Sequence, residues 1–315
     1  MSAITELRSM KRKRGTPATK TSTNLRRSDG KAAAVFLAPW FLGLVTVTLF
    51  PLVASLYLSF TKYDLLSSPQ WVGFQNFVDL FHDERIWQSL KVTMLYVVTS
   101  VPLQLGVALL VAVLLNQGMK GLAFYRSVIY LPSLMGGSVA IAILWREIFG
   151  EEGLLNKFLA LFGIHGTGWV SNPDTALWTI VLLHVWTFGS PMIIFLAGLR
   201  QIPDMYYEAS QLDGASRWRQ FRSITLPLLS PIIFFNLVMQ VITAFQAFTQ
   251  AYVVSGGTGG PSDSTLFYTL YLYQEGFSNL HMGYASAMAW VLVLIILALT
   301  GLNFWLSKFW VFYGD

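Results

Sequence analysis

Long apolar segments separated by short polar stretches dominate the sequence. Six of them reach about the 20 residues that a helix needs to cross a bilayer: residues 32–60, 92–115, 124–145, 175–199, 228–254 and 283–306. The first is longer than the apolar core of a signal peptide, about 7–15 residues, so we expect it to remain as a membrane helix. The pattern predicts an all-α polytopic membrane protein with six transmembrane helices in one membrane domain, residues 32–310.

Composition agrees with a membrane protein and limits the kinds of substrate and binding site that we expect. Only 12% of the 315 residues are charged, about half the share in a soluble domain. The centres of the six segments contain no Asp, Glu, Lys or Arg, and His184 is the single histidine in them. Ion-coupled carriers keep such charges in the membrane for function, so their absence argues against a carrier of that kind. It favours a neutral polar substrate, and the alternative is a charged substrate held by amides and backbone groups. The chain has no cysteine, which excludes disulfides and thiolate metal sites.

Lysine and arginine concentrate on one side of the predicted helices. With the N-terminus inside, sixteen of the 21 lie in inside segments, nine of them in the basic tail, residues 1–31. Positive charge favours the cytoplasmic side, so we expect a multi-pass protein of the plasma membrane with both termini cytoplasmic. The tail is rich in Ser, Thr and Gly and is predicted to be disordered. It serves as a topology anchor or contacts anionic lipid or a partner, and charge on one side of a membrane does not indicate nucleic acid.

A polar island, residues 203–222, separates the fourth and fifth apolar segments. Pro203 suits the first turn of a helix, and we expect that helix over residues 204–212. The Asp-Gly pair that ends at Gly214 is a turn signal, because glycine adopts positive φ readily. A second short helix is predicted over residues 215–223. Two short helices at an angle would form a knob that docks into a groove on a partner; the alternative is an amphipathic loop on the lipid surface.

The same island carries a spaced pattern: Glu208-Ala209-Ser210, three residues, Gly214, nine residues, then Ile224-x-Leu226-Pro227. It resembles the cytoplasmic "EAA" loop of the permease subunits of bacterial ABC importers, which has E-A-A, three residues, G, nine residues and I-x-L-P. Only Ser210 departs from that form. The resemblance extends over residues 32–310, to the permease class that imports maltose, glycerol-3-phosphate and multiple sugars. Gly73, Asn76 and Phe77 match its G-x-x-N-F stretch before the second span.

The resemblance implies a fold, a docking site and partners. The fold would be the type I ABC importer permease fold, with residues 203–222 as the coupling loop. The residues that dock on the ATPase would be Glu208, Ala209, Ser210, Asp213, Gly214 and Arg217. The partners would be a second homologous permease, two copies of a cytoplasmic ATPase that bind ATP and Mg, an extracellular or lipid-anchored substrate-binding protein, a carbohydrate substrate and membrane lipid. The chain itself would hold no cofactor, and mono-, di- and oligosaccharides and glycerol-3-phosphate all fit the class.

A polar stripe on the fifth predicted span is the candidate substrate path. At 100° per residue, its five members fall within an arc of about 120°: Asn236, Gln240, Thr243, Gln246 and Gln250. Amides donate and accept hydrogen bonds and so suit sugar hydroxyls; the alternative is a seam between helices. On the fourth span, His184 and Thr187 join the candidate path, and Pro191 is expected to kink the helix near Thr187. A lone membrane histidine also serves as a packing residue.

Signatures of catalysis are missing from the sequence. It has no G-x-S-x-G, no H-E-x-x-H, no Walker phosphate loop and no pair of intramembrane carboxylates. We therefore expect no catalytic residues and no metal site, and ATP hydrolysis on separate subunits. Two other classes remain as alternatives. A stand-alone channel or facilitator for small polar solutes would need no ATPase, and a membrane enzyme would need catalytic groups that the sequence does not supply.

Overall fold

The computed structural model describes residues 22–117 and 121–312, in two units that divide after Ser55. The first unit holds α1 (Ser22–Gly43), the π-helical turn η2 (Leu44–Leu49) and the start of α2 (Phe50–Ser59). The stretch Ala33–Ser59 is long and apolar enough to cross a membrane. Helix α1 takes in residues 22–31, where composition predicts disorder, so that prediction is wrong for these residues. The rest of the predicted tail, residues 1–21, lies outside the described part of the chain.

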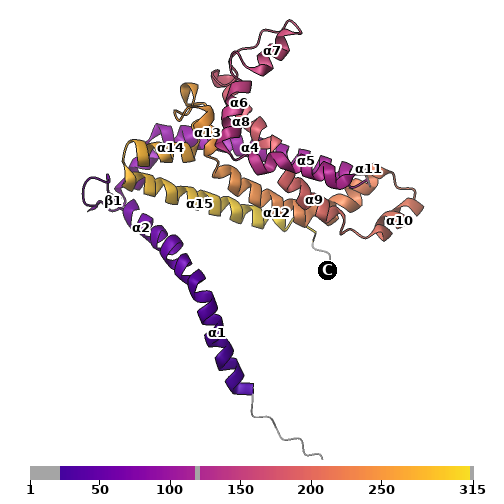
Figure 1. Ribbon diagram of the computed structural model, residues 1–315, viewed down its shortest axis with the longest axis horizontal. Coiled ribbons are helices and arrows are strands. Elements are labelled where there is room, and N and C mark those ends of the chain that lie inside the picture. Colours follow the sequence, from indigo (N-terminus) through magenta and orange to yellow (C-terminus); the bar gives the residue numbers. More distant parts are fainter. Residues whose placement is uncertain (1–21, 118–120, 313–315) are drawn as a thin grey trace, which may run out of the picture. The chain divides into compact units, whose positions relative to one another are not determined.

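The second unit is almost entirely helical (Figure 1). Its one sheet in the described residues is the antiparallel pair β1 (Thr61–Lys62) and β2 (Gln70–Trp71), which register Thr61 against Trp71. The helices follow in this order: α3 (Gln75–His82), α4 (Glu84–Leu115), α5 (Leu122–Met135), α6 (Val139–Ile148), α7 (Leu154–Ala160), α8 (Pro173–Trp186), α9 (Gly189–Leu199), α10 (Asp204–Leu212), α11 (Arg217–Gln220), η3 (Phe221–Thr225), α12 (Leu226–Phe245), α13 (Thr249–Val254), η4 (Pro261–Asp263), α14 (Tyr268–Tyr273), η5 (Gln274–Ser278) and α15 (Met282–Ser307).

The described residues contain four helices that could cross a membrane, or six spans if each of two bent helix pairs counts as one. The all-α polytopic fold is therefore confirmed, while several predicted bounds shift. The second span begins at Glu84 rather than near residue 92, because Asp83 caps α4 and its polar first turns extend past the apolar segment. The third and fourth spans are each two helices, α5–α6 and α8–α9, and the fifth ends at Phe245 rather than at residue 254.

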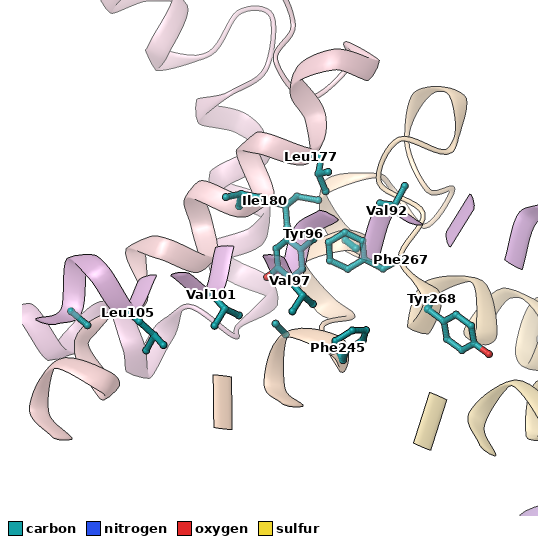
Figure 2. Packing of buried hydrophobic residues seen from close by; sticks show 14 of the residues in the cluster. Val92, Tyr96, Val97, Val101, Leu105, Leu177, Ile180, Phe245, Phe267 and Tyr268 are labelled. Atoms are coloured by element: carbon teal, nitrogen blue, oxygen red, sulfur yellow. The ribbon is translucent and has the colours of Figure 1, made fainter. Parts of the chain in front are cut away.

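Helix α4 forms the centre of the second unit, with α8, α9, α12 and α14 packed around it. Its buried side chains recur every three or four residues, as one helical face requires. Figure 2 shows Tyr96, Val97 and Val101 of α4 against Leu177 and Ile180 of α8. Small residues continue this face toward the far end of α4, and they let neighbouring helices approach closely, as in other membrane bundles.

A hydrogen-bonded network closes the end of the bundle at which α4 begins. Asn76 is buried on α3, and its Nδ2 donates to the carbonyls of Ser59 and Thr61, at 2.9 Å each. The Asp83 carboxylate accepts from the hydroxyls of Tyr271 at 2.6 Å and Tyr284 at 2.8 Å. Burial, and then the bond to Asp83, raises the pKa of Tyr271, so its hydroxyl stays a donor. The network ties α3 and the start of α4 to α14 and α15.

Replacing Asn76 tests whether this network is part of the fold. Asn76→Ala leaves two carbonyls without their buried donor, and we expect the free energy of unfolding to fall by ~1–3 kcal/mol. The neighbouring Gln75→Ala is the matched control, because Gln75 is exposed and its amide reaches only Asp79. Thermal melting in mild detergent compares the two variants. Equal melting temperatures would show that Asn76 does not anchor this end.

Candidate functional site

Three consecutive spans of the second unit are interrupted inside the bundle. Helices α5 and α6 meet at 94° around residues 136–138, and α8 and α9 meet at 40° around Thr187. Helix α12 stops at Phe245, and α13 starts at Thr249. Non-helical backbone at membrane depth is tolerated only where protein or a water-filled cavity satisfies its polar groups. Three such breaks therefore mark the place where the spans can offer polar groups to a solute.

The three breaks touch one another. Ser133 of α5 donates through Oγ to the Thr187 carbonyl at 2.8 Å and accepts from the Ser190 N–H at 3.0 Å. Gly136 packs directly on the Thr187 side chain, with no room for a Cβ. Gln250 of α13 donates to the Gly136 carbonyl at 3.3 Å. The carbonyls of Gly136 and Thr187, at the breaks of the third and fourth spans, are thus each bound by a side chain from another of the three spans.

On the fourth span, the predicted path residues lie at the break, as the predicted kink requires. His184 lies in the last turn of α8. Its ring stands edge-on to Tyr96, with centroids 5.5 Å apart, and its Nε2 is buried with no hydrogen-bond partner among the described residues. Thr187 caps α8, and its hydroxyl donates to the His184 carbonyl at 2.7 Å. Both side chains are therefore engaged in the bend, and their contact with a substrate stays a prediction.

On the fifth span, the prediction of one continuous polar stripe is wrong. Asn236 is buried on α12, while Gln240 is half-buried and Thr243 is exposed on the same helix. Gln246 is the exposed C-cap of α12, and Gln250 belongs to α13. The regular 100° spacing stops at Phe245. No Gly or Pro signals this break; a tertiary contact accompanies it, the bond from the Thr269 hydroxyl to the Ala247 carbonyl.

Gln104 is a site residue that the sequence argument missed. It lies on the buried face of α4, and its Nε2 donates to the Thr187 hydroxyl at 3.0 Å and to the carbonyls of His184 at 3.0 Å and Thr187 at 3.3 Å. Ser133 was missed in the same way. The available signal was an amide or a hydroxyl inside an otherwise apolar segment, which is costly unless it is bound.

The second candidate site is the coupling loop, residues 203–222. Helix α10 matches the predicted range, and Gly214 has φ +74°, as the predicted turn requires. The second short helix differs from the prediction. Helix α11 and the π-helical turn η3 run on into α12, so that Arg217–Phe245 is one helix. Pro227 lies in the first turn of α12. The predicted knob of two separate short helices is therefore wrong: the loop consists of α10 and the extended N-terminal end of the fifth span.

Ser210, the one departure from the "EAA" pattern, stiffens this loop. Its hydroxyl donates to the Tyr207 carbonyl at 2.8 Å and accepts from the Gln220 amide at 2.9 Å. The Tyr207 hydroxyl is bonded to that of Thr225 at 2.9 Å. Helix α10 is therefore fixed to the end of the fifth span at two points, and a rigid loop can transmit force.

The outward side of α10, of the turn after it and of the start of α11 is exposed. Every predicted docking residue is exposed except Ser210, which is half-buried: Glu208, Ala209, Asp213, Gly214 and Arg217. Among the described residues, no ion pair involves Glu208 or Arg217. Leu212 is 91% exposed and Trp218 70% exposed. Large apolar side chains surrounded by unpaired charges are typical of a protein-binding surface.

The two sites differ in the groups that they present. Within residues 22–117 and 121–312, no group of three or more His, Cys, Asp or Glu side chains could hold a metal ion. The broken spans provide amides, hydroxyls and carbonyls, and the loop provides an exposed docking face. The geometry supports solute binding at the breaks and protein binding at α10.

Comparison with known proteins decides the family. The family model for the inner membrane component of binding-protein-dependent transport systems matches residues 82–310. The chain belongs to this family. Its matched part includes the three broken spans and the coupling loop, so both candidate sites lie within the family's common region.

Relatives of nearly the same length agree. The chain is 53% identical to the probable ABC transporter permease protein YesP of Bacillus subtilis (strain 168), over 95% of this chain and 97% of that protein. It is 32% identical to the lactose transport system permease protein LacF of Rhizobium radiobacter, over 92% and 99%. The solved structure of a bacterial alginate ABC transporter in complex with its pentasaccharide-bound periplasmic protein superposes with TM-score 0.78 at 20% identity, over 89% and 95%. The predicted permease fold is thereby confirmed.

The contact between two breaks can be tested at Gly136. A Cβ in Gly136→Ala would overlap the Thr187 side chain and the Pro132 carbonyl, and we expect overpacking of this kind to cost ~1–3 kcal/mol. Gly137→Ala is the matched control, since a Cβ there meets nothing within 4 Å. Melting in detergent is expected to separate the two variants. A loss of stability in Gly137→Ala alone would contradict the packing described here.

Proposed function

We propose that the chain is the membrane-spanning translocation subunit of an ATP-driven sugar importer. It forms the substrate path with a second homologous permease and couples to a separate cytoplasmic ATPase, two copies per transporter, which binds ATP and Mg. Family membership supports the transport role. Sugar as the substrate is supported by relatives that are named for the transport of lactose, starch degradation products and arabinooligosaccharides.

The observation that carries the coupling role is the exposed face of α10. Leu212 and Trp218 lie open beside unpaired Glu208 and Arg217, on a loop that the Ser210 and Tyr207 bonds hold rigid. Such a surface suits a groove of the ATPase, where the apolar side chains would be buried and the charges paired. This end of the bundle is then cytoplasmic, and both termini with it. A binding protein would deliver sugar to the opposite end, at the start of α4.

The substrate path lies where the three spans break. Gln240, Thr243 and Gln246 are accessible on the surface of α12 and its end. Amides that donate and accept suit the many hydroxyls of a sugar. Tyr252 of α13 is 37% exposed and packs against Phe248 and Tyr273, with ring centroids 5.3 and 5.5 Å away. An aromatic face of this kind can cover a sugar ring while the second permease closes the other side.

A facilitator that works without an ATPase is the alternative, and co-purification separates the two functions. We expect a tagged chain extracted from its native membrane in mild detergent to bring down a second permease and an ATPase, identified by mass spectrometry. Recovery of the chain alone, at near-native yield, would reject the importer and leave the facilitator.

Two substitutions, one on α10 and one in the turn after it, test whether this loop couples the ATPase to sugar uptake. Gly214→Asp strains a left-handed backbone position, and Glu208→Lys reverses the charge of the docking face. We expect each to lower sugar uptake by about tenfold or more, equivalent to losing 1.4 kcal/mol of interaction, with membrane insertion unchanged. Glu152→Lys, the same charge reversal at an exposed position between α6 and α7, is the control. Normal uptake by both loop variants would remove the docking role.

The substrate path is tested at Gln246. In Gln246→Leu the exposed amide is lost, and we expect the KM for uptake to rise about fivefold, the effect of one hydrogen bond of ~1 kcal/mol, with little change in ATPase assembly. Gln88→Leu replaces a half-buried glutamine near the start of α4 and is expected to leave KM unchanged. A KM rise in Gln88→Leu, or none in Gln246→Leu, would move the path elsewhere.

A further inference from the structure

The buried amide of Gln104 connects the central helix to the bend of the fourth span. Gln104 is 2% exposed, and its Nε2 is within 3.0–3.3 Å of three acceptors that all belong to His184 or Thr187. These two residues are the last turn and the C-cap of α8. A single side chain of α4 therefore contacts the break from one side, while Ser133 of α5 contacts it from another.

The break itself follows from Pro191. In a continuous helix the Thr187 carbonyl would accept from the N–H of residue 191, and proline has none. That carbonyl instead accepts from Ser133, and the His184 carbonyl accepts from the backbone and the hydroxyl of Thr187. Each carbonyl thus keeps a donor without Gln104. Gln104 adds hydrogen bonds that connect α4 to the bend. Its role is therefore to position the bend, since the two carbonyls have other donors.

The bend lies on a direct mechanical path from the coupling loop. Helix α9 runs from the bend to Leu199, and after a short turn that buries Ile202, α10 begins at Asp204. On the other side of the bend, α8 is tied to α6 through the indole N–H of Trp145, which donates to the Thr179 carbonyl at 2.9 Å. A displacement of α10 therefore reaches the bend through α9 and is passed to the broken third span through α8.

Two buried polar atoms at this cluster have no hydrogen-bond partner among the residues that the structure describes: the Oε1 of Gln104 and the Nε2 of His184. Buried polar groups are nearly always bound, and each exception calls for an explanation. A cluster that is only partly satisfied in one arrangement is suited to a second arrangement in which other partners are reached.

We propose that Gln104 is the positioning residue that sets the bend of the fourth span and thereby transmits movement of α10 to the substrate path. Gln104 contacts no substrate in this role. Removing its amide loosens the bend, so that α9 and α8 no longer move together, while the fold remains intact because both carbonyls keep their other donors.

Spin labels measure the bend directly in the assembled transporter. The chain has no cysteine, so cysteines placed at the exposed Asp174 and Arg200, one in the first turn of α8 and the other just after α9, are the only thiols on this subunit. We expect a narrow distance distribution in the wild type and a broader one in Gln104→Met, with a melting temperature close to that of the wild type. Gln104→Glu keeps one donor when protonated, and we expect the width of its distance distribution to lie between those of the wild type and Gln104→Met.

The second readout is the ratio of sugar molecules transported to ATP molecules hydrolysed. This readout rests on the proposed function. We expect Gln104→Met to lower this ratio by about fivefold to tenfold, the range of one or two hydrogen bonds. Ser100→Ala is the matched control: Ser100 is buried on the same face of α4, one turn away, and its hydroxyl does not reach the bend. Its distances and transport ratio are expected to equal those of the wild type.

Distances in Gln104→Met that equal those of Ser100→Ala would overturn the proposal, and so would an unchanged transport ratio. Should Gln104→Met fail to assemble, the same comparison is made with Gln104→Glu, which keeps the side-chain volume. Failure of the proposed function looks different, because the wild type would then show no ATP-dependent uptake at all, whatever the label distances.

Discussion

Inside a bilayer every backbone polar group has to find a partner within the protein, and this constraint governs the described structure. The long helix α15 meets it by itself. The third, fourth and fifth spans do not, because each is interrupted, and side chains of other elements bind carbonyls at the breaks. Gln250, Ser133 and Thr269 supply these bonds. The breaks are thus kept together, and the polar groups needed for a solute are gathered at one place.

The predicted coupling loop, in contrast, leaves some of its groups without partners among the described residues. Its helix α10 is held from behind by the Ser210 and Tyr207 bonds and leaves its outward face unpaired, with Leu212 almost fully exposed. A helix that is bonded firmly on one side and exposed on the other suits a docking element, because a stiff connection is needed to transmit force. Helix α9 joins this element to the bend at Thr187, so the two candidate sites are adjacent along the chain although they lie at different depths.

Local signals identified much of this arrangement in advance. Pro203 and Gly214 predicted the bounds of α10, and Pro191 predicted the bend of the fourth span at Thr187, since these residues restrict the backbone wherever they stand. The fifth span shows the limit of such reasoning. Nothing at Gln246 or Phe248 marks a break, and the helical wheel continued across it, because the bond from Thr269 to Ala247 is made by a residue far along the chain.

The sequence by itself determined the six apolar spans, the helix and turn of residues 204–214 and the family, because hydropathy, proline, glycine and motif spacing act locally. The tertiary structure alone decided that three spans are broken where they meet, and that Gln104 reaches the bend across 80 residues of chain. It also decided that Ser210 joins α10 to the fifth span. An amide in an apolar segment signals that some partner exists, but which backbone group it binds depends on how the helices pack.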